Sequence, residues 1–278
     1  MPLNVKSPHE YRLQTLADAC KEDEGLSTLV KACTEKYVCF RDEFLNAFSH
    51  SDFSKMATLL DDYRAYAKAL ERKGGVMNER SKYYSSIMEE VPVLLCRKRV
   101  ETLISSLNLD SHLLVMGGAE CVIRIAANPD GTYFYETKRI DFCLAMDTAK
   151  NGKWIPLLGL EVKKYCDKTM FGTILETYKS LQIFRPRTYY GFLVEDEARS
   201  PEVVLNSPIF QKEFILCDGK RNRSELNSIS VPNLERFSVE LLKAAEDALN
   251  VLAKATAETA NQQAEKKAPK KKKSQSKS

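Results

Sequence analysis

The sequence lacks several features that would place it in common classes of protein. No stretch approaches eighteen consecutive apolar residues, so we expect no membrane-spanning helix and no membrane partner. The first residues do not follow the charged-then-apolar layout of a secretion signal, which favours an intracellular protein. The GxxxxGK[ST] motif of ATP-binding loops is also missing, and this argues against an ATP-driven repair helicase.

Residues that bind soft metals are scarce or badly spaced. The chain has only three histidines, and its eight cysteines form no CxxC pair. We therefore expect no structural zinc site. Several cysteines occupy apolar positions of predicted helices or strands, which is typical of reduced, buried thiols.

Basic residues are unevenly distributed along the chain. The formal net charge of +4 includes seven lysines between Lys266 and Lys277, so the rest of the chain is slightly acidic. The window from Lys138 to Arg187 differs, because it holds ten Lys or Arg against five Asp or Glu. A local surplus of this kind is what a phosphate-binding surface requires.

The 278 residues, 44% of them hydrophobic, divide into three regions by pattern. Apolar residues at helical spacing predict a helical N-terminal region over residues 1–112, a scaffold or partner-docking layer, with a break near Glu90 caused by Pro92. Residues 113–262 predict an α/β core that ends in an amphipathic helix. Residues 263–278 form a lysine-rich tail that we expect to be disordered.

The core is organised around the segment from Lys138 to Gln182. Arg139 to Met146 alternates apolar and polar residues, which is typical of a half-buried strand. Trp154 to Tyr165 is nearly continuously apolar until its far end and predicts a central strand. An amphipathic helix follows, and Thr188 to Val194 would return as a parallel strand, which predicts a mixed sheet flanked by helices.

The charged end of the central strand carries the candidate chemistry. Glu161 and Lys163 are two residues apart and share one face, while Val162 offers its carbonyl. Asp141 lies on the neighbouring strand. Two carboxylates and a carbonyl form the oxygen site that Mg²⁺ prefers. Asp147 is a rival to Asp141, but it lies about 20 Å further along an extended strand and beside the turn.

The hairpin register restricts how these residues can meet. A two-residue turn on Asn151-Gly152 would place Asp141 opposite Val162 and send Glu161 to the wrong face. The site therefore requires one odd residue, in a longer loop or a bulge. Pro156 or Gly159 is the natural place for a bulge.

The order of these residues resembles the core of the PD-(D/E)XK nuclease superfamily. The segments KRIDF, GLEVKKYCDKTM and ILETYKSLQ are similar to type II restriction endonucleases of the BbvCI-like heterodimeric kind, over roughly Val115 to Val194. One departure is Ile140, which stands where the superfamily name expects proline. The resemblance implies an α/β, restriction-endonuclease-like core with a helical N-terminal region.

The resemblance also implies a function and its partners. The chain would be a Mg²⁺-dependent subunit, with Mn²⁺ as a substitute, of a bacterial cytoplasmic restriction system. It would cut one strand of double-stranded DNA at a short specific site, together with an unlike homologous subunit or, failing that, as a homodimer. Asp141, Glu161 and the Val162 carbonyl would hold the metal, and Lys163 would position the hydroxide. Both acids should stay ionised, with depressed pKa values.

Other residues are secondary candidates. Glu120 is a candidate additional acid, since related nucleases often bring one from the segment before the first strand, although a solvated glutamate looks the same. Lys179 and Gln182 could approach the site from the following helix, or lie in solvent. Candidate DNA-contacting residues, each of which could equally be a solvated surface charge, are Lys138, Arg139, Lys164, Arg185, Arg187, Lys220, Arg221 and Arg223.

Two further functions are compatible with the sequence. The same fold could serve a structure-specific or repair nuclease that acts as a homodimer. Alternatively, the acids could be vestigial in a DNA-binding module, which would bind DNA without cleaving it.

Overall fold

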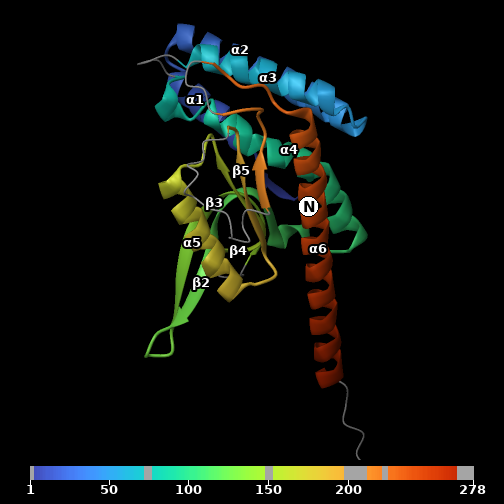
Figure 1. The fold of residues 1–278 in the computed structure, drawn as a ribbon. Helices are drawn as coiled ribbons and strands as arrows, with labels where there is room; N and C mark the ends of the chain where they lie inside the picture. Colours follow the sequence, from blue (N-terminus) through green and yellow to red (C-terminus); the bar gives the residue numbers. More distant parts are fainter. Residues whose placement is uncertain (1–2, 72–76, 148–152, 197–211, 221–224, 268–278) are drawn as a thin grey trace, which may run out of the picture.

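The computed structural model describes residues 3–71, 77–147, 153–196, 212–220 and 225–267 (Figure 1). The helices are α1 (Pro8–Cys20), α2 (Glu24–Ser49), α3 (Phe53–Leu70), α4 (Ser85–Ser106), α5 (Lys168–Phe184) and α6 (Val231–Lys267). The strands are β1 (Asn4–Lys6), β2 (Leu114–Ala127), β3 (Tyr133–Asp147), β4 (Trp154–Lys163), β5 (Tyr189–Val194) and β6 (Glu213–Ile215).

The six strands form one mixed sheet in the order β1-β2-β3-β4-β5-β6. Strand β3 pairs antiparallel with β2 and with β4, whereas β1 with β2, β4 with β5, and β5 with β6 pair parallel. The parallel return from β4 through α5 to β5 confirms the predicted crossover. The fold is the predicted α/β arrangement of a mixed central sheet flanked by helices.

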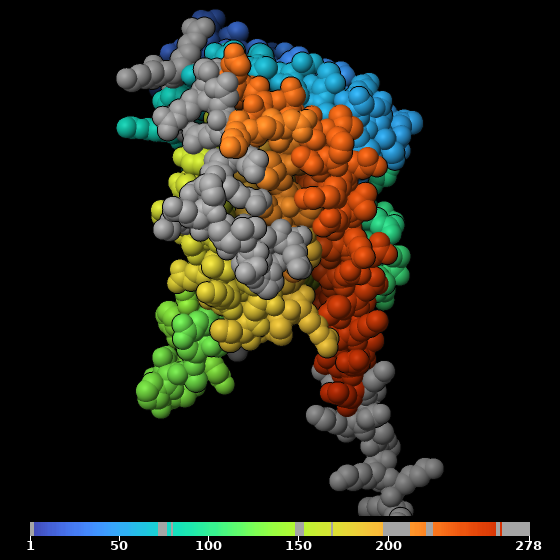
Figure 2. Space-filling model, viewed as in Figure 1, coloured from blue at the N-terminus to red at the C-terminus, as the bar shows by residue number. Residues whose placement is uncertain are grey.

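Helices cover both faces of this sheet. Successive side chains along a strand point to opposite faces, so each strand contributes to two buried clusters. Leu144 and Leu193 face a cluster that is continuous through α1 to α4 and α6. Cys143 and Phe192, one residue away on the same strands, face a smaller cluster beneath α5. The helical N-terminal region and the sheet therefore share one core. Figure 2 shows the β2–β3 hairpin and the end of α6 projecting from the same side of the body.

The predicted break near Glu90 is wrong, because α4 continues from Ser85 to Ser106 with Pro92 inside it. A proline in a helix interior removes one backbone hydrogen bond. Every residue from Val91 to Cys96 is buried, so tertiary packing holds the helix together at this point.

A buried polar network ties the N-terminus to α4. The Glu90 carboxylate accepts hydrogen bonds from Ser7 (2.6 Å), from the backbone N–H of His9 (2.9 Å) and from the Tyr37 hydroxyl (2.9 Å). The imidazole of His9 is fully buried and hydrogen-bonded with Tyr63 through Nε2 at 2.7 Å. These bonds fix the start of α1 against three other helices.

The C-terminal helix is longer than expected, since α6 extends to Lys267 and the boundary of the tail was expected after residue 262. The remainder of the predicted tail, residues 268–278, lies outside the described residues. Within the described ranges, no helix combines the length and the apolar character that crossing a membrane requires.

Candidate active site

The register between β3 and β4 shifts by one residue along the hairpin. Leu144 pairs with Leu158, but Ala145 pairs with Pro156, so Leu157 is an extra residue in β4. This bulge lies beside Pro156, one of the two positions that the sequence indicated. It moves the side chains that follow it in β4 to the opposite face of the sheet. The end of β4 is thereby turned to the face that the site requires.

A second bulge lies in β3 at the first acid itself. In the pairing with β2, Asp141 and Phe142 together face the single residue Gly118. A side chain on Gly118 would place its Cβ 3.2 Å from the Asp141 carbonyl oxygen and 3.1 Å from the Arg139 guanidinium. Glycine therefore permits the close approach by which the bulge re-aims Asp141.

The two bulges bring together the three residues that the sequence singles out. The Lys163 ammonium lies 2.5 Å from Asp141 Oδ2 and 2.9 Å from Glu161 Oε2. The backbone N–H of Val162 donates to the same Asp141 oxygen at 2.9 Å. One lysine thus bridges two carboxylates from neighbouring strands.

Glu161 is held by further donors and is only 3% exposed. Its Oε1 lies 3.0 Å from the Lys138 ammonium and accepts a hydrogen bond of 2.9 Å from the Tyr190 hydroxyl. Lys138 also donates to Thr177 of α5 at 2.6 Å. The helix after the central strand therefore reaches the site through Thr177 and Lys138.

The two acids differ in the direction of their pKa shifts. Burial alone would raise the pKa of Glu161, but Lys163 and Lys138 outweigh it and hold the pKa below its ordinary value. For Asp141 burial dominates, and its pKa is raised despite Lys163. Burial lowers the pKa of Lys163, but the two acids reverse this and keep the amine protonated. The expectation of two depressed acid pKa values is therefore wrong for Asp141, because of its burial.

A third carboxylate near the site comes from a residue that the sequence analysis missed. Glu89 of α4 is half-buried, and burial followed by the charge of Asp141 raises its pKa to about 7. Lys163 and Arg139 act on it in the opposite direction. The available signal was a pair of adjacent glutamates in the mostly apolar first half of α4, and the network described above accounts only for Glu90.

The secondary candidates lie outside these contacts. Glu120 is an exposed residue of β2 paired with Arg139, and it makes no described hydrogen bond or ion pair with the three central residues. Lys179 is exposed on α5, and Gln182 is half-buried there. Neither bonds to the acids among the described contacts.

The candidate DNA-contacting residues divide into separate groups. Lys138 joins the site directly, Arg139 lies exposed beside Glu89, and the Lys164 ammonium lies 4.8 Å from the Tyr84 ring centroid. Lys220 is an exposed loop residue. Arg185 and Arg187 lie just before β5. Arg221 and Arg223 lie outside the described residues.

The donor set of this site fits a Mg²⁺ ion. Both hydrogen bonds to Asp141 end on Oδ2, which leaves Oδ1 for a ligand. The Val162 N–H points to Asp141, and the carbonyl of an extended residue points to the same side as its N–H. In the part of the chain that the structure describes, no three His, Cys, Asp or Glu side chains cluster as a complete cage. Mg²⁺ typically takes one or two carboxylates and keeps several waters.

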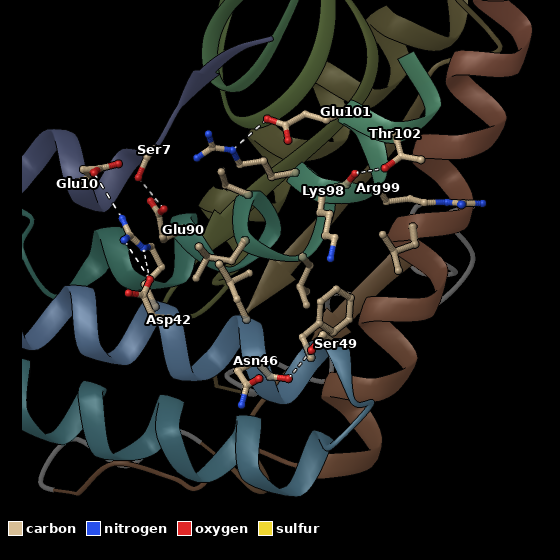
Figure 3. Close-up of a pocket in the computed structure, with 18 of the residues that line it drawn as sticks. Ser7, Glu10, Asp42, Asn46, Ser49, Glu90, Lys98, Arg99, Glu101 and Thr102 are labelled. Atoms are coloured by element: carbon tan, nitrogen blue, oxygen red, sulfur yellow. Dashed lines mark hydrogen bonds and ion pairs between the residues drawn. The ribbon is translucent and has the colours of Figure 1, made fainter. Parts of the chain in front are cut away.

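A large groove elsewhere does not belong to this site. A cavity of about 880 Å³ lies between α2 and α4 and includes Leu242 of α6 in its wall (Figure 3). Its charged groups are largely paired with one another, as in the contact of Arg97 with Glu101 at 3.2 Å. None of the three central site residues lines it.

Comparison with known proteins supports the fold through structure rather than sequence. No protein-family model matches the chain, and no curated protein matches it. Among solved structures the chain is similar to the native BbvCI A2B2 tetramer, with a TM-score of 0.62 and 20% sequence identity. The similarity covers 86% of this chain and 95% of that one. The chain therefore has a fold like that of the BbvCI restriction enzyme.

Proposed function

We propose that the chain is a metal-dependent nuclease that hydrolyses phosphodiester bonds of double-stranded DNA. The observation that carries the proposal is the convergence of Asp141, Glu161 and Lys163 at the end of β4, in a fold similar to a restriction enzyme. Bulges at both strands produce this convergence, and bulges near active sites commonly re-aim functional side chains.

The residues of the chain have distinct roles in this proposal. Asp141, Glu161 and the Val162 carbonyl would hold Mg²⁺, for which Mn²⁺ would substitute. The ion supplies a Lewis acid and an acidified water when bound. Both acids keep Lys163 protonated, and its ammonium orients the two carboxylates. The same ammonium would donate a hydrogen bond to a phosphate oxygen or to the attacking water. Lys138 and Tyr190 fix the Glu161 carboxylate from the other side.

We propose further that the chain is a subunit of a type II restriction endonuclease in the bacterial cytoplasm. It would cut one strand at a short specific site and work with an unlike homologous subunit. The similar solved structure is an A2B2 tetramer, which favours an assembly of two kinds of subunit. A structure-specific or repair nuclease acting as a homodimer is the alternative assembly.

A plasmid assay tests the proposal. The purified chain, alone and with a neighbouring homologous subunit, is incubated with supercoiled plasmid in Mg²⁺ or in EDTA. We expect discrete nicked or linear products that require the metal. Lys163→Ala should lower the rate by about a hundredfold or more, as for other lost electrostatic donors.

Lys31→Ala is the matched control. This variant removes an exposed lysine of α2 that has no place in the proposed site. It should retain most of the cleavage rate. DNA that stays intact under every condition but is bound by the protein would favour a binding module with vestigial acids.

A further inference from the structure

A second basic site lies at the opposite end of the β4–β5 pair from the acids. Arg185, Arg187 and Lys212 line a pocket of about 230 Å³ between the end of α5, the start of β5 and α6. Tyr189, also in its wall, pairs with Leu158 of β4. That position is three residues, or about 10 Å of extended strand, before Glu161. A group in this pocket could not be the phosphate at the acids.

The cations of this pocket have no acid partner in the part of the chain that the structure describes. Within the described residues, neither arginine nor Lys212 forms an ion pair, and Asp247 of α6 is the single carboxylate among the lining residues. Its side chain is exposed and pairs with none of the three. The lining thus carries three positive charges against one negative charge.

The electrostatics of the pocket agree with this lack of partners among the described residues. Burial lowers the pKa of Arg185 and of Lys212, and no nearby acid reverses the effect. Elsewhere in this chain, buried cations with acid partners behave in the opposite way, since the pKa of Lys163 and of Arg64 is raised. Half-buried charges without partners are costly, and a bound anion would offset that cost.

The pocket is also held in shape before any ligand binds. The Arg185 N–H donates to the Leu181 carbonyl at 2.6 Å, and the Thr188 N–H donates to the Arg185 carbonyl at 2.9 Å. The Thr188 hydroxyl donates to the carbonyl of Pro156 at 3.0 Å. The Lys212 ammonium lies 4.5 Å from the Tyr189 ring centroid. The turn that carries both arginines is therefore fixed to α5 and to β4.

We infer that Arg185, Arg187 and Lys212 form a binding site for a phosphate group other than the one to be cleaved. Arginine donors match the tetrahedral oxygens of phosphate, and the pocket has room for one such group with hydration water. The group is either a backbone phosphate of bound DNA or the phosphate of a small molecule. Only the DNA source rests on the proposed function.

Two binding assays on the full-length protein in EDTA test the inference without cleavage. The first measures the unfolding midpoint against inorganic phosphate, with chloride at matched ionic strength as the reference. The second measures the affinity of a short DNA duplex at several salt concentrations.

The variants are Arg187→Gln, whose exposed side chain does not support the core, and Arg185→Gln combined with Lys212→Gln. Lys31→Gln, an exposed residue of α2, is the control.

Phosphate should raise the midpoint of the wild type and of Lys31→Gln, and Arg187→Gln should need about tenfold more phosphate for the same rise. If the duplex is the source, Arg187→Gln should also lower duplex affinity severalfold and reduce the salt slope by about one. A response to inorganic phosphate without a change in duplex affinity assigns the site to a small phosphorylated molecule. If neither probe separates the pocket variants from Lys31→Gln, the inference is overturned.

Discussion

At the scale of single residues, Glu89 of α4 is an acid whose charge changes near neutral pH. The pKa of Glu89 is raised to about 7, so its carboxylate gains charge between pH 6 and pH 8. That charge lies close enough to Asp141 to act on it. If the proposed metal site is correct, Glu89 should strengthen the attraction for Mg²⁺ only at the higher pH.

Glu89→Gln tests this dependence. In the wild type, the Mg²⁺ concentration for half-maximal cleavage should fall severalfold from pH 6 to pH 8, because the ionised carboxylate attracts the cation. In Glu89→Gln the fall should be smaller, and the two proteins should agree at pH 6. Glu120→Gln is the control and should follow the wild type. Equal curves for all three proteins would remove Glu89 from the site.

Another residue-scale prediction concerns stability and does not depend on the nuclease proposal. Burial lowers the pKa of His9 to about 3. The unfolded chain takes up a proton near pH 6.5 and the folded protein does not, so stability is lost as pH falls below that value. Urea unfolding should show a loss of roughly 2 kcal/mol from this group between pH 7 and pH 5. His9→Gln should remove that part of the slope, whereas His112→Gln, which changes an exposed histidine, should keep it.

At the scale of secondary-structure elements, the bulged hairpin is what makes a site from the sequence pattern. Alternation along the strands predicts that Glu161 and Lys163 share a face, and register reasoning predicts that one residue must be out of step. The structure has that residue at Leu157. The bulge at Asp141 was not predicted, because it depends on the pairing of β3 with a strand that lies before it in the chain.

Gly118→Ala tests the element that supports this second bulge. The new Cβ would lie 3.2 Å from a backbone oxygen of Asp141, so the strand must move and stability should fall by about 1–3 kcal/mol. Cleavage should fall with it, since the acid moves. Gly172→Ala in α5 is the control, because its Cβ meets nothing within 4 Å. That change should stabilise the helix by about 0.5–1 kcal/mol. A neutral Gly118→Ala would show that the bulge does not need glycine.

At the scale of the whole molecule, a buried ion pair fastens the N-terminal helices to the end of the sheet. Arg64 of α3 is 1% exposed and pairs with Glu195, which directly follows β5. It also donates to the carbonyl of Asn227 at 3.1 Å, and Glu195 accepts a hydrogen bond from Tyr84. Four distant segments of the chain therefore meet at one guanidinium.

Removing Arg64 should lower the stability of the fold, because the buried carboxylate of Glu195 is left without its cation. Arg64→Met should lower the free energy of unfolding by about 3–5 kcal/mol. Replacing both partners, with Glu195→Leu added, should recover part of the loss. Arg97→Met, which removes an exposed pair with Glu101, should change stability by less than about 1 kcal/mol. Equal effects of the two single variants in denaturant titrations would contradict this account.

The sequence predicted the layers of the molecule better than the contacts between them. Local periodicity was sufficient for the helices, the central strands and the crossover through α5. The contributions of Glu89 and Lys138 to the site, and the role of Arg64, arise from packing between segments far apart in the chain. The continuity of α4 through Pro92 has the same origin, since burial of the surrounding turn outweighs the lost hydrogen bond.

In the proposed nuclease, Asp141 is a functional acid and Asp147, on the same strand, is not. The most direct measurement compares metal-dependent plasmid cleavage by the wild type, Asp141→Asn and Asp147→Asn, each with the same partner subunit. We predict a loss of at least about a hundredfold for Asp141→Asn and nearly full activity for Asp147→Asn. Equal activity of the two variants, or a loss confined to Asp147→Asn, would contradict the account.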